Sequence, residues 1–346
     1  MLDLARELDH TGFDIKFYSF IPTSRCIKFG LQKKCIVSLF GIIAPFLILR
    51  RIFPKLSWIH IKVQDFIMGI FMRKCDICIS LTGYVYAPRI AQKKGAIIIM
   101  ERGSKHILEQ KKILEKNPHK KNEAIPNRNI KCNLKAYQFA NFISVASQHV
   151  KESFLLHQYP ENRIFVNPYG VDLSMFKPLP NIPKKYDVIM VGGWGYEKGC
   201  DLIVEAIRKT NYSFIHVGSI KDVDFPQEKN FTHIDPVDQS KLIEYYNQAK
   251  VFILPSRQDG FGMVLSQALA CNLPIIGSNN CGAPDLKKMV ELPEYITIIK
   301  DYTADAIVTA IHTAIKNYEQ LGERIYAGNA IENLTWEAYG KRYANF

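Results

Sequence analysis

The residues best suited to chemistry lie in one stretch of the chain, between residues 251 and 286. An apolar run at 251–256 ends at Pro255-Ser256, Asp259-Gly260-Phe261-Gly262 follows, and residues 263–271 are helix formers without Gly or Pro. This order predicts a strand, a tight turn and a helix. In an open α/β sheet such a turn lies where ligands bind, and the free N–H groups of the helix attract anions. We therefore expect a ligand that carries phosphate.

A second glycine-rich turn precedes this stretch. The apolar run 187–191 predicts a buried strand, and Gly192-Gly193-Trp194-Gly195 follows it, with Lys198-Gly199 three residues later. Glycine spacing of this kind is a weak phosphate signal by itself. Together with a helix predicted at 202–208 and the Asp259 stretch, it becomes a strong one. A further predicted strand, 214–217, ends at Gly218.

These two turns carry a resemblance to a known family. Pro255-Ser256, the Asp259 turn and the later Asn272-Leu273-Pro274 resemble the donor-binding motif of the retaining GT-B glycosyltransferases of glycosyltransferase family 4. Cys281 to Leu286 is similar to that family's glycine-rich loop over the donor, and Asn167 to Pro178 is similar to its interdomain segment. The resemblance implies two Rossmann-like, doubly wound α/β domains that face each other across a cleft. It also implies a nucleotide diphosphate sugar as the donor.

Three positions depart from the family's pattern. Asp259 stands where the family has a Glu that holds the donor sugar, and Gln267 stands where a second Glu holds the ribose. A hydrogen bond to a charged group contributes about 1.5–3 kcal/mol, against about 0.5–1.5 kcal/mol for a neutral one, so Gln267 should weaken ribose binding without abolishing it. Lys198 matches a family cation on the diphosphate, but Gly193 occupies the place of an Arg. Arg257 could supply that missing charge.

The N-terminal half also alternates between strands and helices. A strand predicted at 96–100 leads directly into Glu101-Arg102-Gly103-Ser104-Lys105-His106, at the end of the strand where ligand contacts are expected. This loop resembles an Arg-Gly-Ser-x-His element on the acceptor side of some family members. Arg102 and His106 are therefore candidates for function, and the alternative is a helix-capping Ser104 beside an ordinary surface His.

The resemblance as a whole predicts a set of candidate site residues, most of them in the C-terminal half. The candidates for catalysis are Arg102, His106, Lys198 and Asp259, and those for donor binding are Gly192, Gly193, Lys198, Gly218, Arg257, Asp259, Gly260, Phe261, Gly262, Met263 and Gln267. No metal is expected, because the family neutralises the leaving diphosphate with cations and helix N-termini. Asp222-Val223-Asp224 has metal-binding spacing, but surface acids of this kind are common in polar loops.

Length and charge restrict the classes of protein and partner. The 346 residues suit two domains, and the formal net charge of +12 favours anionic partners such as nucleotide sugars or an acidic membrane surface. Nucleic acid is not expected, since no nucleic-acid-binding motif is found. Eight scattered Cys without a leading signal peptide predict reduced thiols and a cytoplasmic location.

One apolar run has basic residues at both ends. Lys33-Lys34 precede the run 36–49, and Arg50-Arg51 close it. At about 1.5 Å per residue this run is too short to cross a hydrocarbon core of about 30 Å. It is either a buried helix of the domain or an interfacial helix whose basic flanks contact an anionic membrane. The second interpretation makes segment 33–51 a peripheral membrane contact.

These observations predict a domain organisation. Residues 1–178 form an acceptor-side domain that lacks the family's first strand, residues 179–331 form the domain that binds the nucleotide sugar, and residues 332–346 form a helix that packs back on the first domain.

The predicted activity is sugar transfer, with retention of configuration, from a UDP- or GDP-linked donor to a glycan or lipid-linked acceptor, in the synthesis of cell-surface polysaccharide or glycolipid. Two alternatives remain. A degenerate GT-B protein would bind without catalysis, and a nucleotide-sugar epimerase would need acid and base residues that the sequence does not identify.

Overall fold

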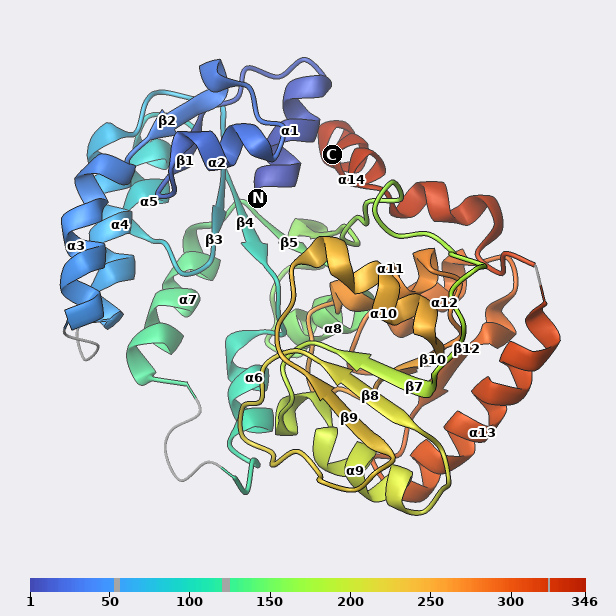
Figure 1. The fold of residues 1–346 in the computed structure, drawn as a ribbon. Helices are drawn as coiled ribbons and strands as arrows, with labels where there is room; N and C mark the ends of the chain where they lie inside the picture. The colour runs from blue at the N-terminus through green and yellow to red at the C-terminus, as the bar shows by residue number, and fades with distance from the viewer. Residues whose placement is uncertain (53–56, 120–124, 323) are drawn as a thin grey trace.

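A computed structural model describes residues 1–52, 57–119, 125–322 and 324–346, which form two α/β units (Figure 1). The N-terminal unit contains α1 (Leu2–His10), β1 (Phe17–Ser19), α2 (Thr23–Lys28), β2 (Ile36–Ser38), α3 (Phe40–Ile52), α4 (Ser57–Phe71), β3 (Ile77–Leu81), α5 (Tyr86–Lys93), β4 (Ile97–Arg102), α6 (Ile107–Leu114), α7 (Asn127–Phe139), β5 (Phe142–Val145), α8 (Gln148–Leu155) and β6 (Ile164–Val166). The C-terminal unit contains β7 (Tyr186–Val191), α9 (Cys200–Arg208), β8 (Phe214–Val217), β9 (Phe231–Ile234), α10 (Leu242–Gln248), β10 (Ala249–Leu254), α11 (Met263–Ala270), β11 (Ile275–Ser278), α12 (Ala283–Met289), β12 (Ile296–Ile299), α13 (Ala304–Leu321) and finally α14 (Trp336–Asn345).

The C-terminal unit is built on a six-stranded parallel sheet in the order β12-β11-β10-β7-β8-β9. Its central strands are continuous apolar runs, as expected for strands that helices cover on both faces. β7 and β10, which precede the two predicted ligand turns, are hydrogen-bonded neighbours in this sheet. Their carboxyl ends therefore bring the two turns together at one edge.

The N-terminal unit holds a four-stranded parallel sheet in the order β3-β4-β5-β6 and a separate parallel pair, β1-β2. Within the described residues, β1 pairs only with β2, and β3 pairs only with β4. The absence of a first strand stays a prediction.

The prediction of one helix over 36–49 is wrong at its start. Residues Ile36–Ser38 pair with β1 as a strand, and the helix begins only at Phe40. β-branched residues at 36 and 37 suit a strand as well as a helix, and pairing with β1 decides between them. No helix in the described part of the chain is long and apolar enough to cross a membrane.

The C-terminal helix α14 returns to the N-terminal unit, as predicted. It lies against α1, so that the two ends of the chain are close together in Figure 1. Leu4 and Leu8 of α1 share a buried apolar cluster with Tyr339 and Tyr343 of α14 and with Ile99 of β4. This cluster ties the last helix to the first sheet.

A buried carboxyl group lies beneath α14. Glu101 of β4 is only 4% exposed and accepts hydrogen bonds from the hydroxyls of Tyr343 and Tyr339. Burial raises the pKa of Glu101 above its ordinary value, although the hydrogen bonds oppose that shift.

This environment predicts a pH-dependent stability that Glu101→Gln should remove. A carboxyl group whose pKa is raised by folding stabilises the fold most when it is protonated, below its unfolded pKa of about 4.3, and that contribution is lost as the pH rises through the folded pKa. The difference in urea unfolding midpoint between the parent and the variant should therefore fall as the pH rises. Parallel curves for the two proteins would contradict this assignment.

Candidate functional site

The two predicted ligand turns meet in an ion pair. Nζ of Lys198, which follows β7, lies 2.6 Å from Oδ2 of Asp259, which follows β10. About a fifth of each side chain is exposed, 20% for Lys198 and 18% for Asp259. Two residues that are far apart in the sequence thus form one charged centre at the carboxyl edge of the sheet.

The pairing sets the charge state of Lys198. Burial by itself lowers the pKa of the Lys198 ammonium, but attraction to Asp259 and the hydrogen bond between them more than offset burial, so the pKa is raised. Lys198 is therefore a cation over the whole physiological pH range. A permanently charged ammonium group here can bind an anion such as phosphate.

Two glycines in the turns have backbone conformations that other residues rarely adopt. Gly262 has φ +81° and forms the N-cap of α11, so the free N–H groups of that helix begin directly after the Asp259 turn. Gly218 has φ +149°, and a β-carbon there would lie 2.0 Å from the carbonyl oxygen of Gly192. The predicted glycines 192 and 218 therefore form one closely packed pair of backbone turns.

Arg257 is already engaged within the protein. Its guanidinium donates to both carboxylate oxygens of Asp201, at 2.6 and 2.7 Å, and lies 3.8 Å from the ring centroid of Tyr196. A bidentate ion pair combined with a cation–π contact fixes the side chain strongly. The role of Arg257 on a diphosphate stays a prediction, and contact with phosphate would have to compete with Asp201.

The ammonium end of the Lys221 side chain lies beside Gly193. A β-carbon built on Gly193 would lie 2.3 Å from Cε and 2.8 Å from Nζ of Lys221. Lys221 follows β8, and its backbone N–H donates to the carbonyl of Trp194. Its ammonium group therefore occupies the space into which a side chain at position 193 would extend.

Gln267 is buried on α11 and has a protein partner. Its Oε1 accepts a hydrogen bond of 2.9 Å from the hydroxyl of Tyr246, which lies in the core. The side chain is 6% exposed, so its predicted contact with ribose stays a prediction.

Two further donor-site candidates flank the Asp259 turn. Phe261 is buried and packs edge-on against Tyr169 of the interdomain segment, with 6.1 Å between the ring centroids. Met263, the first residue of α11, is 41% exposed and so can contact a ligand at the start of that helix.

Arg102 and His106 have structural partners in the N-terminal unit. Arg102 donates to the carbonyl of Lys105 and to the side chains of Gln110 and Asn133, which holds the loop 102–106 in place. His106 is buried, caps α6 through its ring nitrogen and stacks on His157 with 4.0 Å between the ring centroids. Burial lowers the pKa of His106 to about 3, so the ring is neutral at physiological pH. Both residues hold the loop that reaches the Asp259 turn.

The loops of the two units touch at Gly260. A β-carbon there would lie 2.0 Å from the carbonyl oxygen of Gly103. The hydroxyl of Ser147 donates to the carbonyl of Gly260, and Nε2 of His149 donates to the carbonyl of Asp259 at 2.7 Å. Because a carbonyl can only accept, the hydrogen of the His149 ring lies on Nε2. The N-terminal unit therefore binds the backbone of the Asp259 turn directly.

Sequence reasoning missed these contacts between the units. Besides Ser147 and His149, Lys105 donates to Asn280 at 2.6 Å, and the backbone N–H of Gln148 donates to Asp285 at 2.9 Å. Burial lowers the pKa of His149 to about 4, in opposition to its hydrogen bond with Asp259. No local signal marks these residues, since each partner lies more than a hundred positions away in the chain.

The structure offers no cluster that suggests a metal. Across residues 1–52, 57–119, 125–322 and 324–346, no three His, Cys, Asp or Glu side chains gather in a way that could hold a metal ion. In the Asp222-Val223-Asp224 segment, the Asp222 carboxylate accepts from the N–H of Tyr196 and from the side-chain amide of Asn117. That carboxylate thus joins a loop of the second unit to the first.

A family model matches much of the C-terminal half of the chain. Residues 174–330 match the model of the family described as "Glycosyl transferases group 1". This range is somewhat less than half of the chain, and it contains Lys198, Lys221 and Asp259.

Two of the relatives whose names state an activity match more than half of this chain. A probable sucrose-phosphate synthase from Thermosipho melanesiensis is 26% identical over 238 residues, which cover 61% of this chain and 55% of that protein. A GDP-mannose-dependent alpha-(1-6)-phosphatidylinositol monomannoside mannosyltransferase from Mycolicibacterium smegmatis is 23% identical over 239 residues, 59% of this chain and 61% of the relative. The chain therefore spans a little over half the length of each.

A solved structure confirms the fold class. HepE from Anabaena, crystallised with UDP and glucose, aligns with a TM-score of 0.68 and 13% identity over 99% of this chain and 95% of its own. At this identity the likeness establishes the fold alone. The protein has the predicted GT-B architecture of two Rossmann-like units with a returning C-terminal helix.

The contact between the units predicts a specific effect of Gly260→Ala. The new methyl group would collide with a backbone oxygen of Gly103, which cannot rotate away, so the two loops must separate at a cost of about 1–3 kcal/mol. The variant should unfold at a lower temperature and be cut faster by protease than the parent. Gly83→Ala is the matched control, because a β-carbon at Gly83 meets nothing within 4 Å. Equal behaviour of the two variants would show that this contact does not join the units in solution.

Proposed function

We propose that this protein is a glycosyltransferase that moves a sugar from a nucleotide diphosphate sugar, UDP- or GDP-linked, to a glycan or lipid-linked acceptor with retention of configuration. The observation that carries the proposal is the Lys198–Asp259 pair between two glycine-rich turns. The GT-B fold and the family match over residues 174–330 support it. A cytoplasmic location and a role in cell-surface polysaccharide or glycolipid synthesis belong to the same proposal.

The chemistry assigns separate tasks to the two charged residues. Lys198 and the free N–H groups of α11 would bind the diphosphate, and Asp259 would hold hydroxyl groups of the donor sugar. In the reaction the bond between the anomeric carbon and the phosphate oxygen breaks, and a bond to the acceptor oxygen forms on the same face. The acceptor proton passes to the leaving phosphate, so no protein base is required. Lys198 and the N–H groups of α11 would neutralise the leaving diphosphate in place of a metal ion.

The ligand must rearrange the ion pair. A diphosphate that binds Lys198 competes with Asp259 for the same ammonium group, and a sugar hydroxyl that donates to Asp259 replaces the hydrogen bond from Lys198. Because Lys198 keeps a counter-ion and Asp259 keeps a hydrogen-bond donor, neither charged group is left without a partner in the partly buried site. Donor binding is therefore compatible with the burial of this pair.

The test compares Asp259→Asn, Lys198→Ala and Gln267→Glu with the parent, after nucleotide sugars have been screened by thermal shift. Asp259→Asn should lower turnover sharply and leave nucleotide binding largely intact, since the bound diphosphate itself supplies an anion for Lys198. Lys198→Ala should weaken donor binding or turnover about ten- to a hundredfold. Gln267→Glu should tighten nucleotide binding by up to about 1–2 kcal/mol, the gap between neutral and charged hydrogen bonds.

Calorimetry and donor hydrolysis would measure these effects. A degenerate binding protein would show no activity for Asp259→Asn to remove and no gain from Gln267→Glu. An epimerase would convert the nucleotide sugar without any acceptor. Either result would replace the transferase proposal.

A further inference from the structure

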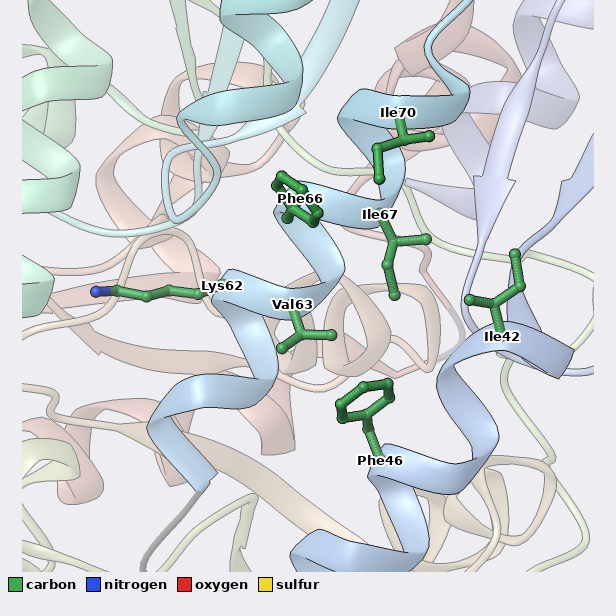
Figure 2. A pocket seen from close by; sticks show the side chains of 7 residues that line it. All are labelled: Ile42, Phe46, Lys62, Val63, Phe66, Ile67 and Ile70. Carbon is green, nitrogen blue, oxygen red and sulfur yellow. The ribbon is translucent and has the colours of Figure 1, made fainter.

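The helical hairpin α3–α4 lies at the edge of the N-terminal unit (Figure 1), and several of its large apolar side chains are exposed. A groove of about 410 Å³ runs between the helices, with apolar walls formed by Ile42, Phe46, Val63, Phe66, Ile67 and Ile70. Figure 2 shows Ile42 and Phe46 of α3 facing Val63 and Ile67 of α4. Phe66 and Ile70 are 53% and 58% exposed, which is unusual for large apolar side chains that lie together.

The opposite face of the hairpin is firmly packed. Leu39 and Ile43 form a buried cluster with Ile67, whose buried side chain also lines the groove, and Gly69 lets α4 approach the ring of Tyr86 on α5. Asp65 of α4 accepts hydrogen bonds from the backbone N–H groups of residues 85–87, at 2.7–2.8 Å. The exposed face is thus held in place by a fixed scaffold.

The charged residues of segment 33–74 are almost all basic. Residues 33–74 contain eight basic residues and a single acidic one, Asp65, which is buried and occupied by the start of α5. Lys62 lines the groove and extends away from its apolar centre in Figure 2, while Arg73 and Lys74 are exposed just beyond α4. An apolar surface with cations around it fits a layer that is apolar inside and anionic at its boundary.

We propose that the exposed face of α3–α4 docks on the surface of an anionic lipid bilayer. Phe46, Phe66 and Ile70 enter the boundary of the hydrocarbon layer, and the surrounding cations contact the headgroups. A second copy of this chain fits less well, because a symmetric contact would place this basic segment against itself. The predicted peripheral membrane contact at 33–51 is thereby extended to α4, which forms most of the groove.

Sedimentation with phosphatidylglycerol vesicles and with phosphatidylcholine vesicles tests this surface in the full chain. Phe46→Ser/Phe66→Ser/Ile70→Ser should weaken binding to the anionic vesicles at least about tenfold. The matched control is Phe13→Ser/Leu156→Ser/Ile325→Ser, which removes similarly exposed apolar side chains elsewhere and should bind like the parent. Lys62→Glu/Arg73→Glu/Lys74→Glu should remove the part of the binding that falls as salt is added.

The proposal fails if the parent sediments with neither vesicle, or if the apolar variant binds as well as the parent. It also fails if the parent forms a dimer without lipid that the apolar variant abolishes, because a second copy would then cover the face. Circular dichroism of each variant confirms that the fold is kept.

Gly193 stands where the family resemblance predicts an Arg on the diphosphate, so one cation of the proposed site is missing at this position. We infer that Lys221 contributes this charge to the diphosphate site, an inference that rests on the proposed function. Its ammonium group lies where a side chain from position 193 would extend, beside the turn that carries Lys198. Arg257, the other candidate, is held by Asp201 on both carboxylate oxygens. The positive charge expected in the turn after β7 is thus supplied by Lys221, which follows the neighbouring strand β8.

The test moves the cation from position 221 to position 193. Lys221→Ala should weaken the binding of UDP or GDP, whichever the parent binds, about tenfold or more, and should leave the binding of the uncharged nucleoside unchanged. Gly193→Arg/Lys221→Ala should restore the diphosphate affinity, because φ of Gly193 lies outside the positive range that favours glycine and the alanine leaves room for the new side chain. Lys229→Ala, at an exposed lysine of the same unit, should have no effect.

Unchanged diphosphate binding in Lys221→Ala, or an equal loss of nucleoside binding, would overturn the role of Lys221 and leave the proposed function standing. Failure of the parent to bind any nucleoside diphosphate would instead overturn the proposed function together with this inference.

Discussion

A partly buried ammonium group is costly unless an anion lies beside it, and the arrangement of this site follows from how that cost is offset. Lys198 lies in the turn after β7, and Asp259 lies in the turn after β10. Only the adjacency of these two strands in the sheet brings the charges within 2.6 Å of each other. The order of the strands, rather than the sequence of either turn, therefore creates the charged centre.

The N-terminal unit also binds the Asp259 turn. Ser147 and His149 donate hydrogen bonds to the backbone carbonyls of Gly260 and Asp259, and Gly260 has no side chain to separate the loops. Hydrogen bonds of this kind, from side chains to backbone carbonyls, are short and directional, so they position the Asp259 turn relative to the N-terminal unit. The N-terminal and C-terminal units are thus joined at the turn of Asp259, the residue with the clearest proposed role in catalysis.

The N-terminal unit combines two kinds of surface with different tasks. Around Glu101, Tyr339 and Tyr343 it buries polar groups to hold the returning helix α14. On the hairpin α3–α4 it leaves large apolar side chains exposed among cations. A protein that acts on a lipid-linked acceptor would use such a surface to bring its reactive edge close to the membrane.

The sequence by itself determined the α/β class, the two glycine-rich turns and the pairing of strands with helices, because apolar periodicity and glycine position are local properties. It also identified Lys198 and Asp259 as candidates, through a motif contained in short segments. The tertiary structure alone placed Lys221 beside Gly193, held Arg257 on Asp201 and brought Ser147 and His149 to the Asp259 turn. It also decided that residues 36–38 form a strand and that α4 shares an exposed groove with α3. These facts depend on partners that are distant along the chain, and hydrophobic pattern and spacing carry no information about which distant segments will meet.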